Sequence, residues 1–78
     1  MCLVYAIKSS SSGRIYIGQT ENFERRLVEH NTGRVSSTST DRPWVLLKAE
    51  EFDTRAEARW AERQLKASKG RREKWLKL

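Results

Sequence analysis

Two short runs of β-branched and aromatic residues, 3–8 and 14–18, are separated by four serines and a glycine. Successive side chains of a β-strand point to opposite faces, so Ile15 and Ile17 share one face of the second run and Tyr16 lies on the other. A five-residue connection that ends in glycine suits a β-hairpin. The pattern therefore predicts an antiparallel hairpin with a tyrosine in each strand.

A helical pattern follows the hairpin directly. A helix is predicted over residues 22–31, because an asparagine able to cap its start precedes a glutamate in the first turn and a glycine follows its end. Phe23 and Leu27 are four residues apart and should face the sheet. Arg26 and His30 form a neighbouring row with the same spacing, so both side chains should emerge on one side of this helix.

The second half of the chain supplies one more strand and two more helices. A polar Ser/Thr-rich loop spans residues 34–42, and a proline opens a predicted strand at residues 43–49. A Thr-Arg-Ala-Glu capping box begins a helix over residues 54–70, and a short basic helix is predicted over residues 71–78. The fold class is α/β, or α+β in stricter usage. A small three-stranded mixed or antiparallel sheet is flanked by helices, in the order β-β-α-β-α-α.

The positive charge of the chain is concentrated in its last third. The 78 residues carry 16 Lys/Arg and 10 Asp/Glu, for a net charge of +6. Residues 1–54 hold seven of each kind, so residues 55–78 carry the whole excess. Such a region either binds a polyanion, first nucleic acid and second an anionic membrane surface, or only keeps a helix face solvated. The candidate nucleic-acid-binding residues are Arg55, Arg59, Arg63, Lys66, Lys69, Arg71 and Arg72.

The bulk composition restricts the class of protein. A chain of 78 residues can build one small domain, so we expect a single domain over residues 1–78. No apolar run approaches the ~20 residues that a membrane span requires, and no signal peptide is visible. Cys2 is the only cysteine, which excludes an internal disulfide and a cysteine-based zinc site. We therefore expect a cytoplasmic monomer.

Glu62 is an acid among apolar neighbours. At helical spacing, Ala58, Ala61 and Leu65 form one narrow stripe of the predicted third helix, and Glu62 falls within it. A carboxylate that faces a core is unfavourable unless a cation pairs with it or a metal coordinates it. Two interpretations remain open on helix geometry: a structural partner of an arginine, or a metal ligand at the rim of a site.

The chain resembles the GIY-YIG nuclease family. The second tripeptide of that family's name is intact at residues 16–18, and residues 3–5 stand in the place of the first. Arg26 lies ten residues after the second tyrosine, His30 follows four residues later, and Glu62 occurs on a later helix, as in the family. The similarity covers nearly the whole chain and is closest to the minimal, stand-alone, single-domain bacterial members.

The resemblance implies a metal-dependent DNA endonuclease, structure-selective or active in DNA repair or recombination. Glu62 would bind one Mg²⁺ or Mn²⁺ ion, and the planar fork of Arg26 would bind a phosphate. Tyr16 would orient the attacking water or take its proton, while Tyr5 and His30 would relay that proton or hydrogen-bond the phosphate. The products would carry a 5′-phosphate and a 3′-hydroxyl.

Departures from the family pattern keep a second function open. Leu and Val replace Gly and Ile in the first tripeptide, no asparagine follows Asn31, and the loop at residues 34–42 is Ser/Thr-rich rather than basic. The alternative is a nucleic-acid-binding module with the same fold and little or no cleavage. A chain of this size is expected to need a protein partner for targeting. A peripheral membrane protein is least favoured, because Trp75, Leu76 and Leu78 offer little apolar area.

Overall fold

The computed structural model describes residues 1–77, and the order of its elements is the predicted β-β-α-β-α-α. The strands and helices are β1 (Cys2–Ser9), β2 (Ile15–Thr20), α1 (Phe23–Asn31), the 3₁₀ turn η1 (Ser39–Asp41), β3 (Trp44–Phe52), α2 (Arg55–Ala67) and α3 (Lys69–Leu76). Several boundaries differ from the sequence prediction. α2 ends at Ala67 rather than at residue 70 because Ser68 has an extended backbone, and β2 continues to Thr20 rather than ending at residue 18. β3 runs on to Phe52 because it pairs with β1 along its length, and α3 begins at Lys69 because the Ser68 hydroxyl caps it. The last position of the predicted helix 71–78 lies outside the described residues.

The three strands form an antiparallel sheet in the order β2-β1-β3. Tyr5 lies opposite Gly18 and Ile7 opposite Tyr16, so both tyrosines are on one face. This confirms the predicted hairpin and its alternation. β2 is an edge strand, and this position leaves its outer side open to groups from both faces of the sheet.

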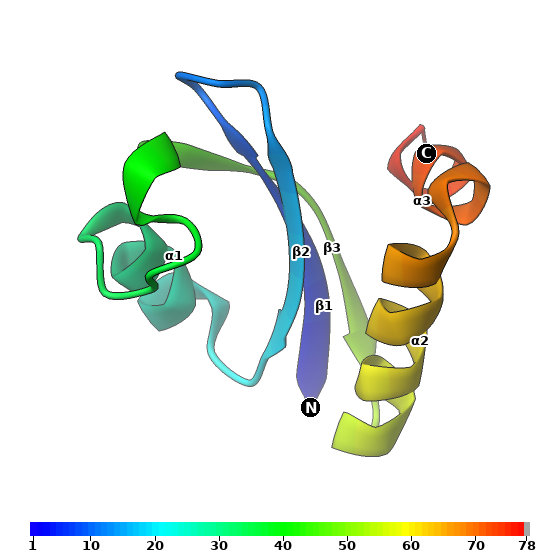
Figure 1. The fold of residues 1–78 in the computed structure, drawn as a ribbon. Helices are drawn as coiled ribbons and strands as arrows, with labels where there is room; N and C mark the ends of the chain where they lie inside the picture. Colours follow the sequence, from blue (N-terminus) through cyan, green and yellow to red (C-terminus); the bar gives the residue numbers. More distant parts are fainter. Residues whose placement is uncertain (78) are drawn as a thin grey trace.

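Helices cover both faces of the sheet. Figure 1 shows α1 on one side, and α2 and α3 on the other. On the α1 side, Tyr5, Ile7 and Trp44 form a buried cluster against which Phe23 and Leu27 pack, as the sequence predicted. The cluster on the other side comprises Cys2, Val4, Ala6, Ile17 and Ala58. None of the helices in residues 1–77 combines the length and apolar character that crossing a bilayer requires.

The predicted helix boundaries rest on observed caps. The Asn22 side chain accepts a hydrogen bond from the Arg25 amide at 3.1 Å. The Thr54 hydroxyl accepts one from the Glu57 amide and donates one to the Glu57 carboxylate, each at 3.1 Å. Gly33, just after α1, has a φ of 83°, a conformation that favours glycine. Local sequence signals therefore determine where α1 and α2 begin and where the chain turns after α1.

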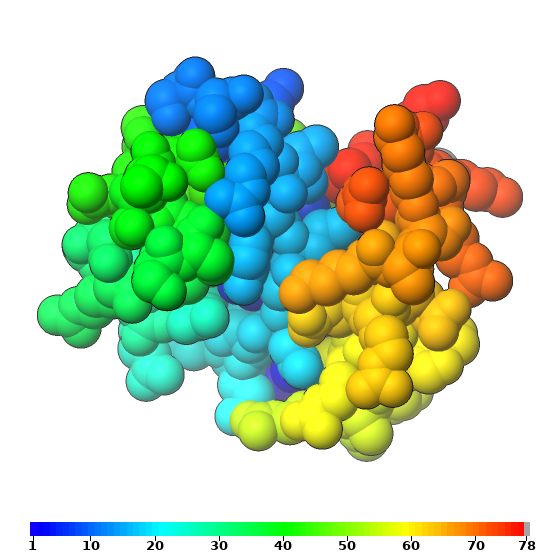
Figure 2. Space-filling model, viewed as in Figure 1, coloured from blue at the N-terminus to red at the C-terminus, as the bar shows by residue number. Residues whose placement is uncertain are grey.

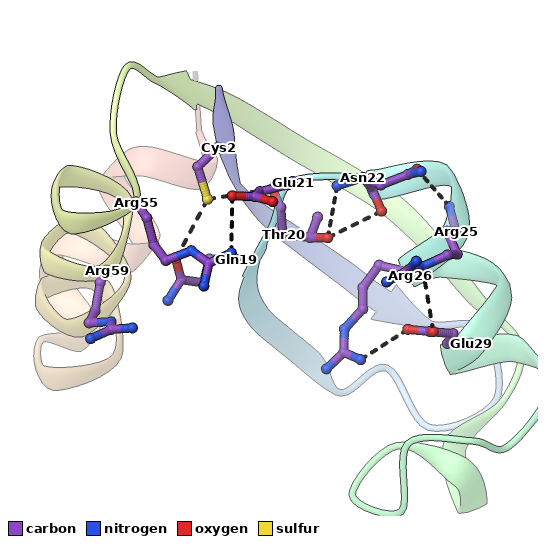
Figure 3. Close-up of a pocket in the computed structure, with 10 residues that line it drawn as sticks. All are labelled: Cys2, Gln19, Thr20, Glu21, Asn22, Arg25, Arg26, Glu29, Arg55 and Arg59. Carbon is purple, nitrogen blue, oxygen red and sulfur yellow. Dashed lines mark hydrogen bonds and ion pairs between the residues drawn. The ribbon is translucent and has the colours of Figure 1, made fainter.

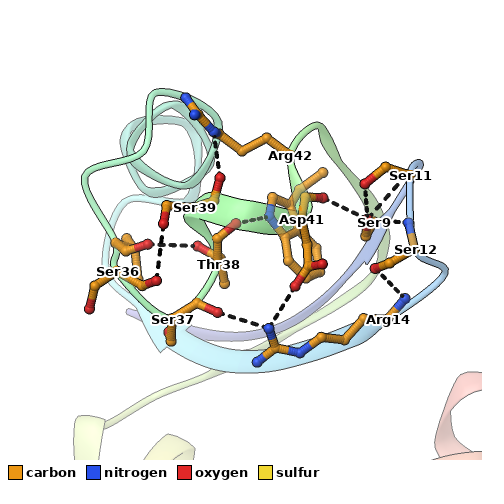
Figure 4. A network of polar contacts seen from close by, with 12 residues as sticks. Ser9, Ser11, Ser12, Arg14, Ser36, Ser37, Thr38, Ser39, Asp41 and Arg42 are labelled. Carbon is orange, nitrogen blue, oxygen red and sulfur yellow. Dashed lines mark hydrogen bonds and ion pairs between the residues drawn. The ribbon is translucent and has the colours of Figure 1, made fainter.

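The Ser/Thr-rich loop is tied to the hairpin by polar contacts (Figure 4). Arg14 donates to the Asp41 carboxylate and to the Ser37 carbonyl, each at 2.8 Å. The buried Ser9 hydroxyl donates to the Asp41 carbonyl at 2.6 Å. Asn31 hydrogen-bonds both the amide and the carbonyl of Trp44 at the start of β3. These contacts hold the loop against the face of the sheet that carries the two tyrosines.

Candidate active site

A buried chain of hydrogen bonds begins at Tyr5. Its hydroxyl lies 2.9 Å from Nε2 of His30, and Nδ1 of His30 lies 2.8 Å from Oγ1 of Thr38. The Thr38 hydroxyl donates to the Val35 carbonyl at 3.2 Å, so its oxygen accepts from His30 Nδ1. His30 is therefore protonated on Nδ1, and its Nε2 accepts the Tyr5 proton. Tyr5 thus donates to His30, His30 donates to Thr38, and Thr38 donates to the Val35 carbonyl.

Burial fixes the protonation states of this chain. It raises the pKa of Tyr5 to about 12, although the neighbouring Arg26 opposes the increase. Burial also lowers the pKa of His30, and the positive charge of Arg26 lowers it further. At neutral pH, Tyr5 is consequently a neutral phenol and His30 a neutral imidazole. Both side chains are fully buried and both imidazole nitrogens are occupied, so His30 orients Tyr5 rather than reaching a ligand.

Gly18 brings the two tyrosines close together. A Cβ atom at this position would lie 2.6 Å from the Tyr5 hydroxyl oxygen and 3.1 Å from the Tyr16 ring. The ring centroids of Tyr16 and His30 are 5.0 Å apart, and those of Tyr16 and Tyr5 are 6.4 Å apart. Glycine is thus required here for the space it leaves, which explains why the third position of the second tripeptide carries no side chain.

We expect Gly18→Ala to lower the free energy of unfolding by about 1–3 kcal/mol, the usual effect of overpacking a core. The Tyr5 ring is enclosed and cannot move aside easily. Gly70→Ala is the matched control, because a Cβ atom there would have no neighbour closer than 4.0 Å and alanine favours the helix by up to ~1 kcal/mol. Urea unfolding of both variants tests this. Equal stabilities for the two would contradict the steric role of Gly18.

Arg26 extends from α1 into a hollow of about 400 Å³ between α1 and α2 (Figure 3). Its guanidinium lies beside Tyr5, whose hydroxyl raises the pKa of Arg26 as a hydrogen-bond acceptor. It also bonds the Glu29 carboxylate at 3.1 Å. Arg55 and Arg59 reach the same hollow from α2. Arg55 is paired with Glu21 at 3.0 Å, whereas Arg59 has no carboxylate within ion-pair distance among residues 1–77.

Glu62 approaches β2 from the opposite face of the sheet. Its side chain is 18% exposed, and its carboxylate pairs with the Lys66 ammonium at 2.8 Å. It lines a second hollow of about 460 Å³, together with Gln19, Arg59 and Arg63. Of the two interpretations of this acid, the structure shows a cationic partner, but that partner is a lysine on the same helix rather than an arginine.

The donor set at Glu62 is small. Residues 1–77 contain no group of three or more His, Cys, Asp or Glu side chains able to hold a metal ion. Mg²⁺, however, commonly keeps several waters and binds one or two carboxylates together with substrate phosphates. A single carboxylate that faces a basic hollow fits that kind of site, and it does not fit a site built wholly from protein ligands.

The two hollows and a third are neighbours along β2, and we call the three together the basic groove. The first and second share Gln19 and Arg59, and the second and third share Lys66. Figure 2 shows this hollowed face between the blue strand β2 and the yellow-to-orange helix α2. Tyr16 lines the third hollow, so Tyr16, Glu62 and Arg26 all border the groove. Its predicted nucleic-acid-binding residues are Arg55, Arg59, Arg63, Lys66, Lys69 and Arg72.

Arg71, also predicted to bind nucleic acid, does not line the groove. It bonds Gln64 at 3.0 Å and lines a separate apolar hollow with Trp60 and Trp75.

Thr38 belongs to the site, although the sequence did not indicate it. It is buried and holds His30, but it is one of five Ser/Thr residues in a polar loop. No local signal distinguishes it from its neighbours.

Comparisons with known proteins agree on one family. Residues 1–75 match the family model described as the GIY-YIG catalytic domain. The UPF0213 protein of Enterococcus faecalis is 38% identical over 69 residues, covering 83% of this chain and 78% of the relative. The UPF0213 protein SSP2268 of Staphylococcus saprophyticus is 36% identical over 76 residues, covering 96% and 89%. The solution NMR structure of the UPF0213 protein BH0048 from Bacillus halodurans is similar, with a TM-score of 0.59 and 27% identity, covering 97% and 82%.

Proposed function

Because this chain belongs to the GIY-YIG catalytic domain family, a nuclease-type family, we propose that it is a metal-dependent endonuclease that hydrolyses phosphodiester bonds in DNA. The observation that carries the proposal is the convergence of Tyr16, Arg26 and Glu62 on one basic groove, although they come from three elements and two faces of the sheet. A phosphodiester in this groove would meet a phenol, a guanidinium and a carboxylate.

Arg26 is the phosphate-binding group in this proposal. The Tyr5 hydroxyl donates to His30 and is therefore free to accept from the Arg26 guanidinium beside it. Glu29 supports the fork from α1. A planar guanidinium fixed by two partners can meet two oxygens of a phosphate without reorganising. Tyr5 and His30 thus act as positioning residues.

Tyr16 is the group left to handle the attacking water. Its hydroxyl makes no hydrogen bond to any side chain or backbone group within residues 1–77, and its ring lies at the groove. The Lys66 ammonium lies 5.6 Å from the centroid of that ring, so a cation stands next to the phenol. Tyr16 would accept a hydrogen bond from water or take its proton, whereas Tyr5 is buried and its hydroxyl already donates to His30.

Glu62 would hold one Mg²⁺ or Mn²⁺ ion. When bound, the ion would stabilise the charge that develops on the phosphate and on the leaving oxygen. The carboxylate faces the groove, one hollow away from Arg26, so the two groups would flank a phosphate from different sides. A protein partner would then direct this small domain to its substrate, in keeping with roles in DNA repair or recombination.

A cleavage panel tests the proposal. Purified protein is incubated with supercoiled, flapped and branched DNA in Mg²⁺, in Mn²⁺ and in EDTA. We expect nicking or cutting in at least one metal-containing reaction and none in EDTA. Metal-independent binding with no cleavage of any substrate would favour the alternative, a nucleic-acid-binding module that keeps the fold. The Glu62–Lys66 ion pair favours this alternative, because the charge of the acid is already balanced by the lysine.

We expect non-specific DNA affinity to depend on the arginines of α2 that form no ion pair with any of residues 1–77. Arg59 and Arg63 both line the groove, whereas Arg55 is already paired with Glu21. Each phosphate contact contributes about 0.9 to the slope of log K against log salt, so replacing both with glutamine should flatten that slope by about 1.8. Fluorescence anisotropy across a salt series measures it. An unchanged slope would show that this face of α2 is only solvated.

A further inference from the structure

Lys66 connects the two halves of the site. Its ammonium lies 2.8 Å from the Glu62 carboxylate and 5.6 Å from the centre of the Tyr16 ring. It is also the residue shared by the hollow that contains Glu62 and the hollow that contains Tyr16. One side chain from α2 therefore bridges groups that belong to opposite faces of the sheet, across the open edge of β2.

The ammonium occupies a cation-binding position. A carboxylate that is largely buried, as Glu62 is, presents few directions from which a cation can approach, and Lys66 takes one of them. A divalent ion bound to the same carboxylate would lie close to the ammonium and repel it. The two cations cannot share Glu62 without a loss of affinity for one of them.

We propose that Lys66 is an internal competitor for the metal at Glu62: the metal binds only as the ammonium leaves the carboxylate, and the ammonium's contact with Tyr16 changes with it. This inference rests on the proposed function, in which Glu62 is the metal ligand. It assigns Lys66 a positioning role within the site, distinct from the non-specific contacts of Arg59 and Arg63. It also implies weak metal binding in the free protein.

Isothermal titration of Mn²⁺ into DNA-free protein tests the competition. Lys66→Met removes the charge and keeps the length of the side chain. We expect it to tighten Mn²⁺ binding about fivefold or more, because an exposed ion pair contributes up to ~1 kcal/mol and this energy corresponds to a factor of about five in affinity. Arg63→Met is the matched control. It removes one positive charge from the same helix and the same hollow, but Arg63 makes no ion pair with Glu62. Less than a twofold change is expected there.

A second measurement uses the unmodified protein. Diamagnetic Mg²⁺ should shift the NMR signals of the Tyr16 ring as Lys66 moves, and in Lys66→Met this shift should largely vanish. Equal tightening in both methionine variants would reduce the effect to bulk charge and overturn the proposal. Unchanged affinity in Lys66→Met would overturn it too, provided that Glu62→Gln abolishes binding. If Glu62→Gln binds Mn²⁺ normally, the metal assignment itself fails.

Discussion

Replacing Glu62 with glutamine is expected to abolish metal-dependent cleavage while the fold and most of the DNA affinity remain. Glutamine keeps the shape of the side chain on the stripe next to Ala58, so packing should change little. It removes the negative charge that would bind Mg²⁺, a cation that binds oxygen ligands and depends on carboxylate charge in proteins. Initial cleavage rates in Mg²⁺, with circular dichroism and DNA binding alongside, measure the three properties separately.

Glu51→Gln is the control for that experiment. Glu51 lies on β3, at the edge of the sheet away from the groove, and is exposed. The Glu51→Gln substitution removes one negative charge, as Glu62→Gln does, and should leave cleavage unchanged. Normal cutting by the Glu62 variant would refute the metal-ligand assignment. Loss of its folded structure would instead show that the Glu62–Lys66 pair is chiefly structural.

Arg26→Lys is expected to reduce cleavage by roughly 10²-fold or more, the scale seen when one preorganised donor is removed from a transition state. Lysine preserves the positive charge and therefore most of the DNA affinity. It cannot contact Tyr5, Glu29 and two phosphate oxygens at once, as the planar fork can. Single-turnover rates at saturating protein separate this chemical defect from weaker binding.

The neighbouring arginine provides a sharp comparison. Arg25 is 76% exposed and lies 3.8 Å from Glu29. Arg25→Ala removes a full charge from the same turn of α1, yet it should cut nearly normally. Equal losses at positions 25 and 26 would mean that α1 contributes bulk charge rather than a positioned fork.

The positions of Tyr16, Arg26 and His30 could be predicted from the sequence because the signals for them are local. A period of two placed Tyr16 on one face of its strand, and spacing by four placed Arg26 and His30 on one side of α1, where Phe23 and Leu27 pin the helix to the sheet. Caps at the starts of α1 and α2 identified both boundaries. Periodicity and capping involve residues within one turn or one hairpin, so they do not depend on the rest of the fold.

The partners of these residues were decided by tertiary structure. Thr38 became the acceptor for His30 because Ser9, Arg14 and Asp41 hold the loop against the sheet. Nothing in the sequence separates it from the other hydroxyls of that loop. The pattern also left the partner of Glu62 open, although that partner, Lys66, is only four residues further along α2 and forms a local pair. What packing of α2 against β1 and β2 decided is that Lys66 lies over the Tyr16 ring. Contacts between segments tens of residues apart depend on how whole elements pack, which no local pattern encodes.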